Sequence, residues 1–306
     1  MKVGLVHNPS AGKGDYTADD LGRALKKAGY AVSTLSSDCD LRGELKREPV
    51  DFVAVAGGDG TQRRAALELI GTGIPIAPLP LGTANNVGRS FGIRGTPQEI
   101  IAGWRPDRPR AFDVGMARGP WGERPFLEGC GLGIIGRSIS IIEEIDHATS
   151  REFDEPEDKL HRDLSVYIAL VHELSTVRIE MEFDGREAVE DVLLLEILNI
   201  RHAGPRIELT RAADPTDGFL DIVMATSGDR ERLRHSLQSC LSGKTPDPIL
   251  DHTKTRAVKL KLGPAEFRID DEVVLRKAEI RGKADACVEL SFEVVPGALQ
   301  VIGSAP

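Results

Sequence analysis

The sequence predicts an α/β domain with a parallel sheet at the N-terminus, followed by a β-rich sandwich domain. Residues 2–103 alternate short apolar segments with amphipathic helical ones, an order typical of parallel α/β sheets. After Trp104, a proline-containing linker at 105–109 precedes segments that are mostly strand-like. A chain of 306 residues is long enough for two such domains. Their expected boundaries are 1–108 together with 297–306 for the first, and 109–296 for the second.

The N-terminal elements follow from apolar periodicity and from helix-capping residues. Thr17 and Asp20 have the spacing of a capping box at the start of one helix, and Thr96 and Glu99 have the same spacing at the start of another. A further helix is expected over 40–48. The strands of this domain are expected at 2–7, 31–35, 52–56 and 74–79.

The second domain is predicted mainly from short apolar and β-branched runs. Two amphipathic helices are expected near 160–176 and 230–242. The acid-rich residues 147–158 are expected to form a solvated loop. The predicted strands are 111–117, 124–130, 178–183, 189–200, 206–210, 219–225, 257–262, 266–276 and 288–295.

Composition excludes several classes of protein. Hydrophobic and charged contents of 41% and 28% are those of an ordinary globular protein, and the net charge of −9 argues against nucleic acid as a partner. The four cysteines form no CxxC pair, so neither a zinc site nor a disulfide framework is expected. No segment reaches the roughly 18 apolar residues that span a bilayer, and the N-terminus lacks a signal-peptide pattern. We therefore expect a cytoplasmic protein whose membrane contact is peripheral.

A glycine-rich turn directly follows the apolar run 52–56, with the sequence Gly57-Gly58-Asp59-Gly60-Thr61. Glycines let a phosphate approach the main chain, which any Cβ would obstruct. The carboxylate of Asp59 would repel a bare phosphate, so its presence favours a hydrated Mg²⁺ between the two. Thr61 is expected to cap the helix that follows. The alternative is an ordinary glycine turn in which Asp59 is only a capping group.

Two more polar loops follow strands of the same predicted sheet. One comes after strand 2–7 and the other after strand 74–79. The carboxyl ends of parallel strands meet at one sheet edge, so the three loops would line a single nucleotide site. The first of these loops alone would be an unremarkable βα loop, and the alternative for the second is that Asn85 and its neighbours serve only to cap the next helix. The candidate nucleotide-binding residues are Asn8, Pro9, Ser10, Ala11, Gly12, Gly57, Gly58, Asp59, Gly60, Thr61, Gly82, Thr83 and Asn85.

These motifs, in this order, resemble the signature of the diacylglycerol kinase catalytic domain superfamily, which includes bacterial lipid kinases, sphingosine kinases and ceramide kinases. Residues 214–221 resemble its Asp-Gly-x-Leu-Asp segment, 268–272 its Asp-Gly-Glu, and 296–299 its closing segment. The likeness covers essentially the whole chain. It implies a fold of the NAD-kinase and diacylglycerol-kinase type, with an α/β nucleotide-binding domain and a β-sandwich domain for the lipid substrate.

The resemblance also implies an activity, the transfer of the γ-phosphate of ATP to the hydroxyl of diacylglycerol, a sphingoid base or a related lipid. Glu272 is implied as the base that accepts the hydroxyl proton, with Asp270 as a second candidate. Mg²⁺ and the glycine-loop dipoles, with Asp59 beside them, would offset charge on the transferred group. Without the resemblance, 270–272 would be interpreted as an acidic hairpin turn. The expected ligands are ATP, Mg²⁺ and a lipid at a membrane surface, and sheet edges of the second domain offer a surface for a homodimer.

Two metal positions are implied in the same way. A structural Mg²⁺ is expected at Asp217, with the backbone oxygens of Asp214 and Phe219 as further ligands. The alternative there is a plain Asp-Gly turn. Asp113 matches an aspartate that joins a Mg²⁺–water network near Asp59, and the alternative is a solvent-facing strand aspartate.

Several positions depart from the family pattern. Gln62-Arg63-Arg64 stands where Leu-Asn-Glu is usual, and Asn86, Glu128 and Asp271 replace Asp, Asn and Gly. These changes indicate either a rearranged metal site or weakened catalysis. Arg63 and Arg64 either bind an anionic group or form an exposed helical face. Because NAD kinases share Gly-Gly-Asp-Gly, an NAD kinase and a catalytically silent nucleotide- or lipid-binding protein are the alternatives.

Overall fold

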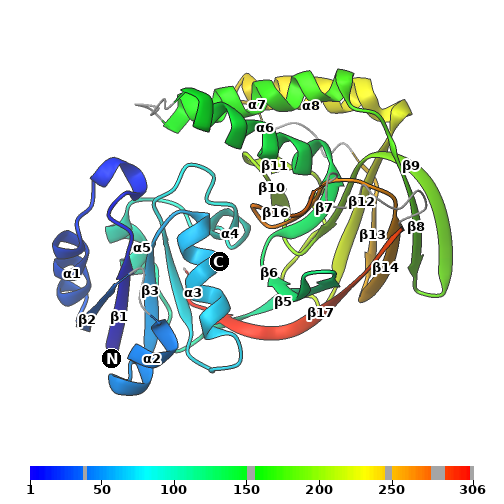
Figure 1. Ribbon diagram of the computed structural model, residues 1–306. Helices are drawn as coiled ribbons and strands as arrows, with labels where there is room; N and C mark the ends of the chain where they lie inside the picture. The colour runs from blue at the N-terminus through cyan, green and yellow to red at the C-terminus, as the bar shows by residue number, and fades with distance from the viewer. Residues whose placement is uncertain (37–39, 150–155, 245–249, 277–286, 304–306) are drawn as a thin grey trace. The chain divides into compact units, whose positions relative to one another are not determined.

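The computed structural model describes residues 1–36, 40–149, 156–244, 250–276 and 287–303. The chain folds into two compact units (Figure 1). Unit 1 comprises residues 1–114 with 296–306, and unit 2 comprises residues 115–295. The division therefore follows Val114, whereas the sequence suggested a boundary at 108. Two strands, β5 (Arg110–Gly119) and β17 (Val288–Val301), contribute residues to both units.

Unit 1 contains a parallel sheet in the order β2-β1-β3-β4. All of β3 is buried, as expected for a continuous apolar run in a parallel sheet. Val301, the last residue of β17, pairs in parallel with Ile76 of β4. The predicted parallel sheet is thus confirmed. Its strands are β1 (Lys2–His7), β2 (Ala31–Ser36), β3 (Phe52–Gly57) and β4 (Ile76–Pro80).

The helices of unit 1 begin largely where capping residues predicted them. Thr17 and Asp20 form the expected capping box, and so do Thr96 and Glu99. Leu21 of the first helix is fully buried against the sheet. The helical segments are η1 (Ala11–Gly14), α1 (Ala18–Lys27), α2 (Leu41–Arg47), α3 (Asp59–Leu69), α4 (Asn86–Ser90) and α5 (Pro97–Gly103).

Unit 2 is a β-sandwich-like assembly of antiparallel strands. The long strand β9 organises it, because its first half pairs with β8 while its second half pairs with both β7 and β12. Phe126, Phe267 and Phe292 lie in the buried interior with the inward-facing aliphatic residues. The strands are β6 (Gly122–Phe126), β7 (Gly129–Gly133), β8 (Val177–Phe183), β9 (Arg186–Leu198), β10 (His202–Ala203), β11 (Ile207–Glu208), β12 (Leu220–Thr226), β13 (His252–Thr255), β14 (Ala257–Leu262), β15 (Phe267–Ile269) and β16 (Glu272–Leu275).

Three helices of unit 2 lie together on one side of its strands (Figure 1). They are α6 (Ile134–Thr149), α7 (Pro156–Glu173) and α8 (Arg230–Leu241), with η2 (Ser227–Asp229) before the last. Their apolar residues, such as Tyr167 and Leu233, share a buried cluster with Leu194 of β9. No helix in the described residues is long and apolar enough to span a bilayer.

Helix α6 was not predicted, and the expectation of a loop over 147–158 was wrong at both ends. Residues 147–149 finish α6 and 156–158 start α7, whereas 150–155 lie outside the described residues. The helix begins with Ile134 and Ile135 directly after a glycine-rich strand, and isoleucine and serine are weak helix formers. Packing against β9 and α7 overrides that weak propensity.

Two predicted strands are each interrupted by a break. Segment 124–130 is divided into β6 and β7 around Leu127 and Glu128. Segment 266–276 is divided into β15 and β16 by a turn in which Asp270 has a φ of 51°. The carboxylate of Asp270, at the second break, accepts hydrogen bonds from main-chain N–H groups at the first. The two breaks are therefore parts of one hydrogen-bonded structure.

Candidate functional site

The Gly57–Thr61 turn connects β3 to α3 without a side-chain cap. Gly58 is the N-cap residue, and α3 begins at Asp59. The expectation that Thr61 caps this helix is wrong, because Thr61 lies inside its first turn. Thr61 Oγ1 instead accepts a hydrogen bond of 3.0 Å from Asn8 Nδ2. A Cβ on Gly57 would lie 2.6 Å from Thr61 Cβ, so the tight turn requires glycine there.

The side-chain amide of Asn8 joins the first loop to the glycine turn. Besides donating to Thr61, it accepts hydrogen bonds at Oδ1 from Ser10 N (3.1 Å) and Ser10 Oγ (2.7 Å). The main-chain N–H of Asn8 donates to Ala56 O at 2.9 Å. Pro9 and Ser10 are exposed, and the loop continues into η1. Asn8 therefore fixes its own loop against the end of β3.

The third loop touches the glycine turn through the main chain. Leu81 N donates to Gly57 O at 2.9 Å. A Cβ on Gly82 would lie 2.5 Å from Gly58 Cα, so this close approach of two main chains requires glycine. Asn85 has a left-handed φ of 55°, and its amide accepts from Gly82 N (2.8 Å) and donates to Gly82 O (2.6 Å). Asn85 thus closes the loop and does not cap α4 with its side chain.

The three predicted loops therefore meet at one edge of the unit 1 sheet. The first turn of α3 presents main-chain N–H groups that have no carbonyl partner within the helix, and the helix dipole favours an anion there. The missing Cβ atoms of Gly57 and Gly82 let these main chains pack closely against Thr61 and Gly58, and main-chain N–H groups gathered in this way are suited to a phosphate chain. A pocket of about 420 Å³, large enough for a small ligand, shares this loop and is lined by Asp15, Tyr16, Pro80, Leu81, Gly82, Gly95, Thr96, Pro97 and Glu99.

Gln62, which stands where the family usually has leucine, has a structural role. Its side chain is buried, and Nε2 donates to Val55 O at 2.6 Å and lies 3.5 Å from Leu79 O. The amide therefore ties together the carboxyl ends of β3 and β4. On the same helix, Arg63 is half-buried and Arg64 is exposed.

The two unit 1 aspartates of the predicted metal network have different surroundings. Asp59 Oδ1 accepts a long hydrogen bond of 3.4 Å from Val87 N, at the start of α4. Asp113 is buried in β5, and its Oδ1 accepts from Gly297 N at 2.7 Å. The solvent-facing alternative for Asp113 is therefore wrong, since its side chain is buried and its carboxylate binds β17 at Gly297, where φ is 60°. The joint metal network of Asp59 and Asp113 remains a prediction.

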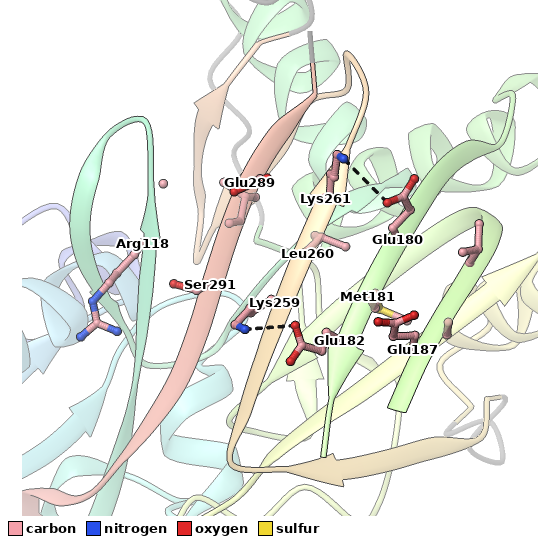
Figure 2. Close-up of a pocket in the computed structure, with 14 residues that line it drawn as sticks. Arg118, Glu180, Met181, Glu182, Glu187, Lys259, Leu260, Lys261, Glu289 and Ser291 are labelled. Atoms are coloured by element: carbon pink, nitrogen blue, oxygen red, sulfur yellow. Dashed lines mark hydrogen bonds and ion pairs between the residues drawn. The ribbon is translucent and has the colours of Figure 1, made fainter. Parts of the chain in front are cut away.

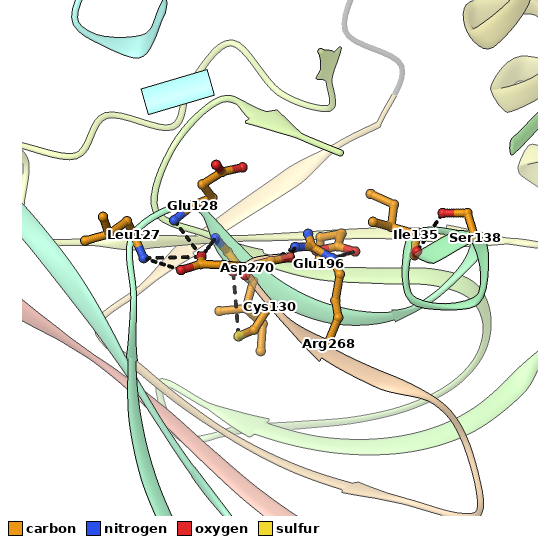
Figure 3. A network of polar contacts seen from close by, with 10 residues as sticks. Leu127, Glu128, Cys130, Ile135, Ser138, Glu196, Arg268 and Asp270 are labelled. Atoms are coloured by element: carbon orange, nitrogen blue, oxygen red, sulfur yellow. Dashed lines mark hydrogen bonds and ion pairs between the residues drawn. The ribbon is translucent and has the colours of Figure 1, made fainter. Parts of the chain in front are cut away.

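Asp270 in unit 2 is enclosed by main-chain donors (Figure 3). Its side chain is 4% exposed, and its carboxylate accepts hydrogen bonds of 2.9 to 3.3 Å from the N–H groups of Leu127, Glu128 and Gly129. Asp270 N in turn donates to Gly129 O at 2.8 Å. These bonds connect the β15–β16 turn to the break between β6 and β7. The geometry gives Asp270 an anchoring role in this turn.

A fully buried ion pair supports the same turn from inside. Arg268 is 1% exposed and Glu196 is fully buried; the guanidinium donates to both carboxylate oxygens and to Asp270 O (Figure 3). Burial raises the pKa of the Glu196 carboxyl group, although the charge of Arg268 opposes this rise. For Arg268, burial favours the neutral form, but Glu196 outweighs it and the pKa is raised. Through its hydrogen bonds to Glu196 and to Asp270 O, the Arg268 guanidinium holds the backbone that leads to Glu272.

Glu272 is the accessible carboxylate at the end of this acidic turn. It is exposed at the start of β16, and its Oε2 accepts a hydrogen bond of 2.8 Å from Arg124 on β6. Asp271 is exposed and Glu128 is half-buried. Of the two implied bases, Glu272 is thus the one that a solvent-borne group can reach.

The predicted metal ligands Asp214, Asp217 and Phe219 lie in one turn before β12. Asp214 Oδ1 accepts from Thr216 N (3.1 Å) and Oγ1 (2.7 Å), while Asp214 O accepts from Asp217 N (3.3 Å). Asp217 Oδ1 accepts from Phe219 N at 3.0 Å, and Oδ2 pairs with Lys254. Within the described ranges, no group of three or more His, Cys, Asp or Glu side chains is arranged to hold a metal ion.

A larger hollow of about 700 Å³ lies on the strands of unit 2, away from the predicted residues. Figure 2 shows Lys259 turned toward Glu182 and Lys261 toward Glu180, across neighbouring strands β14 and β8. These charged side chains make the surface unsuitable for an acyl chain.

The residues that hold the predicted groups in place were not predicted from the sequence. Arg268 and Glu196 had a detectable signal, because each is a charged residue inside an otherwise apolar strand run. Gln62 and Asn8 gave no such signal, since their partners are main-chain and hydroxyl groups far away in sequence. Arg124 and Lys254 lie on strands that the sequence does not place beside their partners.

Comparison with known proteins agrees with the resemblance seen in the motifs. A profile of the "Diacylglycerol kinase catalytic domain" matches residues 2–117, and one of the "YegS C-terminal NAD kinase beta sandwich-like domain" matches residues 146–303. The "Diacylglycerol kinase" of Mycobacterium tuberculosis is 30% identical over 219 residues, which cover 68% of this chain and 65% of that protein. A "Probable lipid kinase YegS-like" of Pseudomonas savastanoi is 28% identical over 267 residues, 85% of this chain and 78% of that protein.

The fold is also found among solved structures. The crystal structure named as that of a diacylglycerol kinase from Bacillus anthracis superposes with a TM-score of 0.63 at 19% identity, over 100% of this chain and 97% of that one. This likeness establishes the two-part fold. The matched region spans just under two thirds of the mycobacterial relative's own length.

Proposed function

The chain belongs to the diacylglycerol kinase catalytic domain family, and from this premise we propose that it transfers the γ-phosphoryl group of ATP to a lipid hydroxyl. The acceptor would be diacylglycerol, a sphingoid base or a related lipid. The observation that carries the proposal is the meeting of three loops at the end of β3. Two glycines there, Gly57 and Gly82, occupy positions where a Cβ would collide with the neighbouring loop or turn.

Unit 1 would bind the nucleotide. The N–H groups at the start of α3 and the glycine main chain would hold the phosphates, because both place positive dipoles against an anion. The pocket beside Pro80–Gly82 is suited in size to the nucleoside. Asn8 and Asn85 would act by fixing the loops, since their amides are bonded to Thr61, Ser10 and Gly82.

Mg²⁺ bound with ATP would supply positive charge that offsets the phosphates during transfer. Asp59 would be the residue of this chain that holds the ion, because it is the carboxylate placed in the glycine turn. Its existing bond to Val87 N keeps the carboxylate beside the loop.

Glu272 would accept the proton of the acceptor hydroxyl while the hydroxyl oxygen bonds to the γ-phosphorus and the bond from that phosphorus to the β–γ bridging oxygen breaks, so that ADP leaves. The exposed position of Glu272 supports this role, and Arg124 would orient its carboxylate. Asp270 would position the turn, because its carboxylate already accepts bonds from three main-chain N–H groups. The lipid would be taken from a membrane surface by peripheral contact.

A phosphotransfer assay tests this proposal. Purified protein is incubated with γ-labelled ATP, Mg²⁺ and a panel of lipids in detergent micelles, and lipid products are separated by thin-layer chromatography. We expect one lipid class to be labelled, with Glu272→Gln and Asp59→Asn strongly impaired. The matched control is Glu182→Gln, which removes an exposed strand carboxylate of unit 2 that faces Lys259.

Three outcomes would contradict the proposal. They are no labelled lipid at all, equal product from the wild type and both site variants, and labelling of NAD under the same conditions. Calorimetric binding of ATP without turnover on any acceptor would indicate a catalytically silent nucleotide-binding protein instead.

A further inference from the structure

Most polar groups of the turn at 214–219 are already bonded to other groups of the chain. The groups in question are the Asp217 carboxylate and the carbonyl of Asp214, which the family likeness implies as metal ligands. Asp217 Oδ1 already accepts from Phe219 N at 3.0 Å, and Asp214 O accepts from Asp217 N at 3.3 Å. The second oxygen of Asp217 pairs with the ammonium group of Lys254. The turn therefore already has a positive partner within the chain.

Lys254 reaches this turn from the neighbouring strand. Strands β12 and β13 are antiparallel neighbours (Figure 1). In their register, Asp221 is directly opposite Lys254. Side chains of directly opposed residues lie on the same face of a sheet. Burial alone would lower the pKa of Lys254, but the hydrogen bond to Asp217 and the charges of Asp221, Asp217 and Asp214 raise it. One ammonium group thus pairs with Asp217 and lies on the same face of the sheet as Asp221.

Asp221 is a buried carboxylate close to this turn. It is fully buried, and neither of its oxygens has a hydrogen-bond partner among the described residues. The nearest ion-pair nitrogen is His252 Nε2, at 3.8 Å from Oδ1. A buried carboxylate without donors is costly unless positive charge lies close to it. Burial raises the pKa of Asp221, and the positive charge of Lys254, which lies opposite it in the sheet, opposes this rise.

A lysine and a magnesium ion satisfy such a cluster differently. Mg²⁺ requires six oxygen ligands in near-octahedral geometry and usually keeps several waters. A lysine ammonium group has three donors on a flexible stem and adapts to carboxylates that are already part of a hydrogen-bonded turn. The turn at Asp217 has the second arrangement, because one oxygen of its carboxylate is already paired with Lys254 and the other accepts from Phe219 N.

We infer that Lys254 is the resident cation of this turn, in the place where the family likeness implies a structural Mg²⁺. Unit 2 of this chain would then fold and remain folded without a divalent ion at Asp217. This inference is independent of the proposed phosphotransfer, because it concerns the stability of unit 2 in the absence of nucleotide and lipid.

Thermal unfolding of the nucleotide-free full chain tests the inference. Wild type is compared in EDTA and in about 10 mM MgCl₂, which is ample for a weak cation site. We expect the same melting temperature in both. Lys254→Met removes the ammonium group at similar volume and should lower the melting temperature in EDTA by roughly 3–8 °C. Mg²⁺ should restore much of this loss, because the unneutralised carboxylates then form a cation site.

Two further variants separate charge at this turn from charge in general. Lys254→Arg retains the cation and should remain insensitive to Mg²⁺. Lys259→Met removes an exposed lysine of the next strand, paired with Glu182, and should neither lower the melting temperature appreciably nor create a response to Mg²⁺.

The metal content of the wild type is decisive even if Lys254→Met does not fold. Protein purified in Mg²⁺ and desalted should hold far less than one Mg²⁺ per chain by mass spectrometry. About one Mg²⁺ per chain that is lost in Asp217→Asn would overturn the inference. Stabilisation of the wild type by Mg²⁺ that disappears in Asp217→Asn would overturn it as well.

Discussion

The glycine turn of unit 1 and the acidic turn of unit 2 both gather main-chain N–H groups around a place for negative charge. In unit 2 the anion is part of the chain, because Asp270 inserts its carboxylate among the N–H groups of residues 127–129. In unit 1 the N-cap residue is Gly58, which has no side chain to take that place. A cluster of main-chain N–H groups therefore anchors a turn in unit 2, whereas in unit 1 such a cluster is suited to an anionic ligand.

Because of this difference, we expect mutations in the two turns to affect different properties, ligand binding in unit 1 and folding in unit 2. Changes in the glycine turn should alter ligand binding more than folding, because the N–H groups there are not bonded to a capping side chain. Changes around Asp270 should alter folding more than ligand binding, because its carboxylate and the Arg268–Glu196 pair are buried and bonded. Asp271 and Glu272 are the exceptions in the acidic turn, since both are exposed.

The largest expected effect on activity is that of Glu272→Gln. Removal of a general base typically lowers turnover by about 10²–10⁴-fold, and the amide cannot accept the proton. The melting temperature should stay within about 2 °C of the wild type, because exposed ion pairs such as Glu272–Arg124 contribute little. The measurement is kcat with the preferred lipid, alongside calorimetric unfolding. A fully active variant would remove Glu272 from the mechanism.

The second effect concerns the contact between the glycine loops. Gly82→Ala would place a Cβ about 2.5 Å from Gly58 Cα, so the two loops must separate. Misplacement of a binding loop by about 1 Å can reduce activity by about 10²-fold, and we expect weaker ATP binding to account for most of the loss. Gly22→Ala in α1 is the matched control, since no atom lies within 4 Å of the added Cβ. Unchanged ATP affinity in Gly82→Ala, measured by calorimetry, would show that the glycine contact does not shape the nucleotide site.

The third effect is on stability and on its pH dependence. Arg268→Met leaves Glu196 buried without its partner, which should cost roughly 3–5 kcal/mol. Without the guanidinium, the pKa of Glu196 in the folded state rises further above its unfolded value of about 4.3. The native state then binds a proton that the unfolded state releases, so stability falls as pH rises above that value. Urea unfolding from pH 5 to pH 8 should therefore show a deficit relative to the wild type that grows with pH.

A double variant provides the control for this buried pair. Arg268→Met with Glu196→Leu removes both charges, and it should recover most of the lost stability and the wild-type pH dependence. A single variant that is as stable as the double variant at pH 8 would mean that Glu196 finds another partner.

The parallel sheet could be predicted from the sequence because its determinants are local. Apolar runs, capping boxes and glycines at strand ends are read within a few residues, and they located β1 to β4 and the three loops. The breaks in segments 124–130 and 266–276 could not be predicted in this way. They depend on Asp270 reaching N–H groups more than 140 positions away.

The candidate site, too, could be predicted from the sequence only in part. Gly57, Asp59 and Gly82 were identified because their residue types indicate their chemistry. The sequence could not say that the amides of Asn8 and Asn85 would be used within the loops, or that Asp217 would face Lys254. Whether a polar side chain is offered to a ligand or used inside the fold depends on partners that only tertiary structure brings near.

The substitution Asp270→Asn tests whether Asp270 anchors the acidic turn, as the contrast between the two units implies. The substitution turns an acceptor-only carboxylate into an amide whose NH₂ group would face N–H donors of residues 127–129. Loss of charge-assisted hydrogen bonds of this kind costs about 1.5–3 kcal/mol each, so a melting temperature lower by roughly 4–10 °C is expected. Asp271→Asn is the matched control, because Asp271 is the exposed neighbour in the same turn and should leave stability unchanged. Activity per folded molecule should fall far less in Asp270→Asn than in Glu272→Gln. If Asp270→Asn instead keeps the wild-type melting temperature and loses turnover as completely as Glu272→Gln, then Asp270 is the base, and its main-chain donors serve catalysis rather than anchoring.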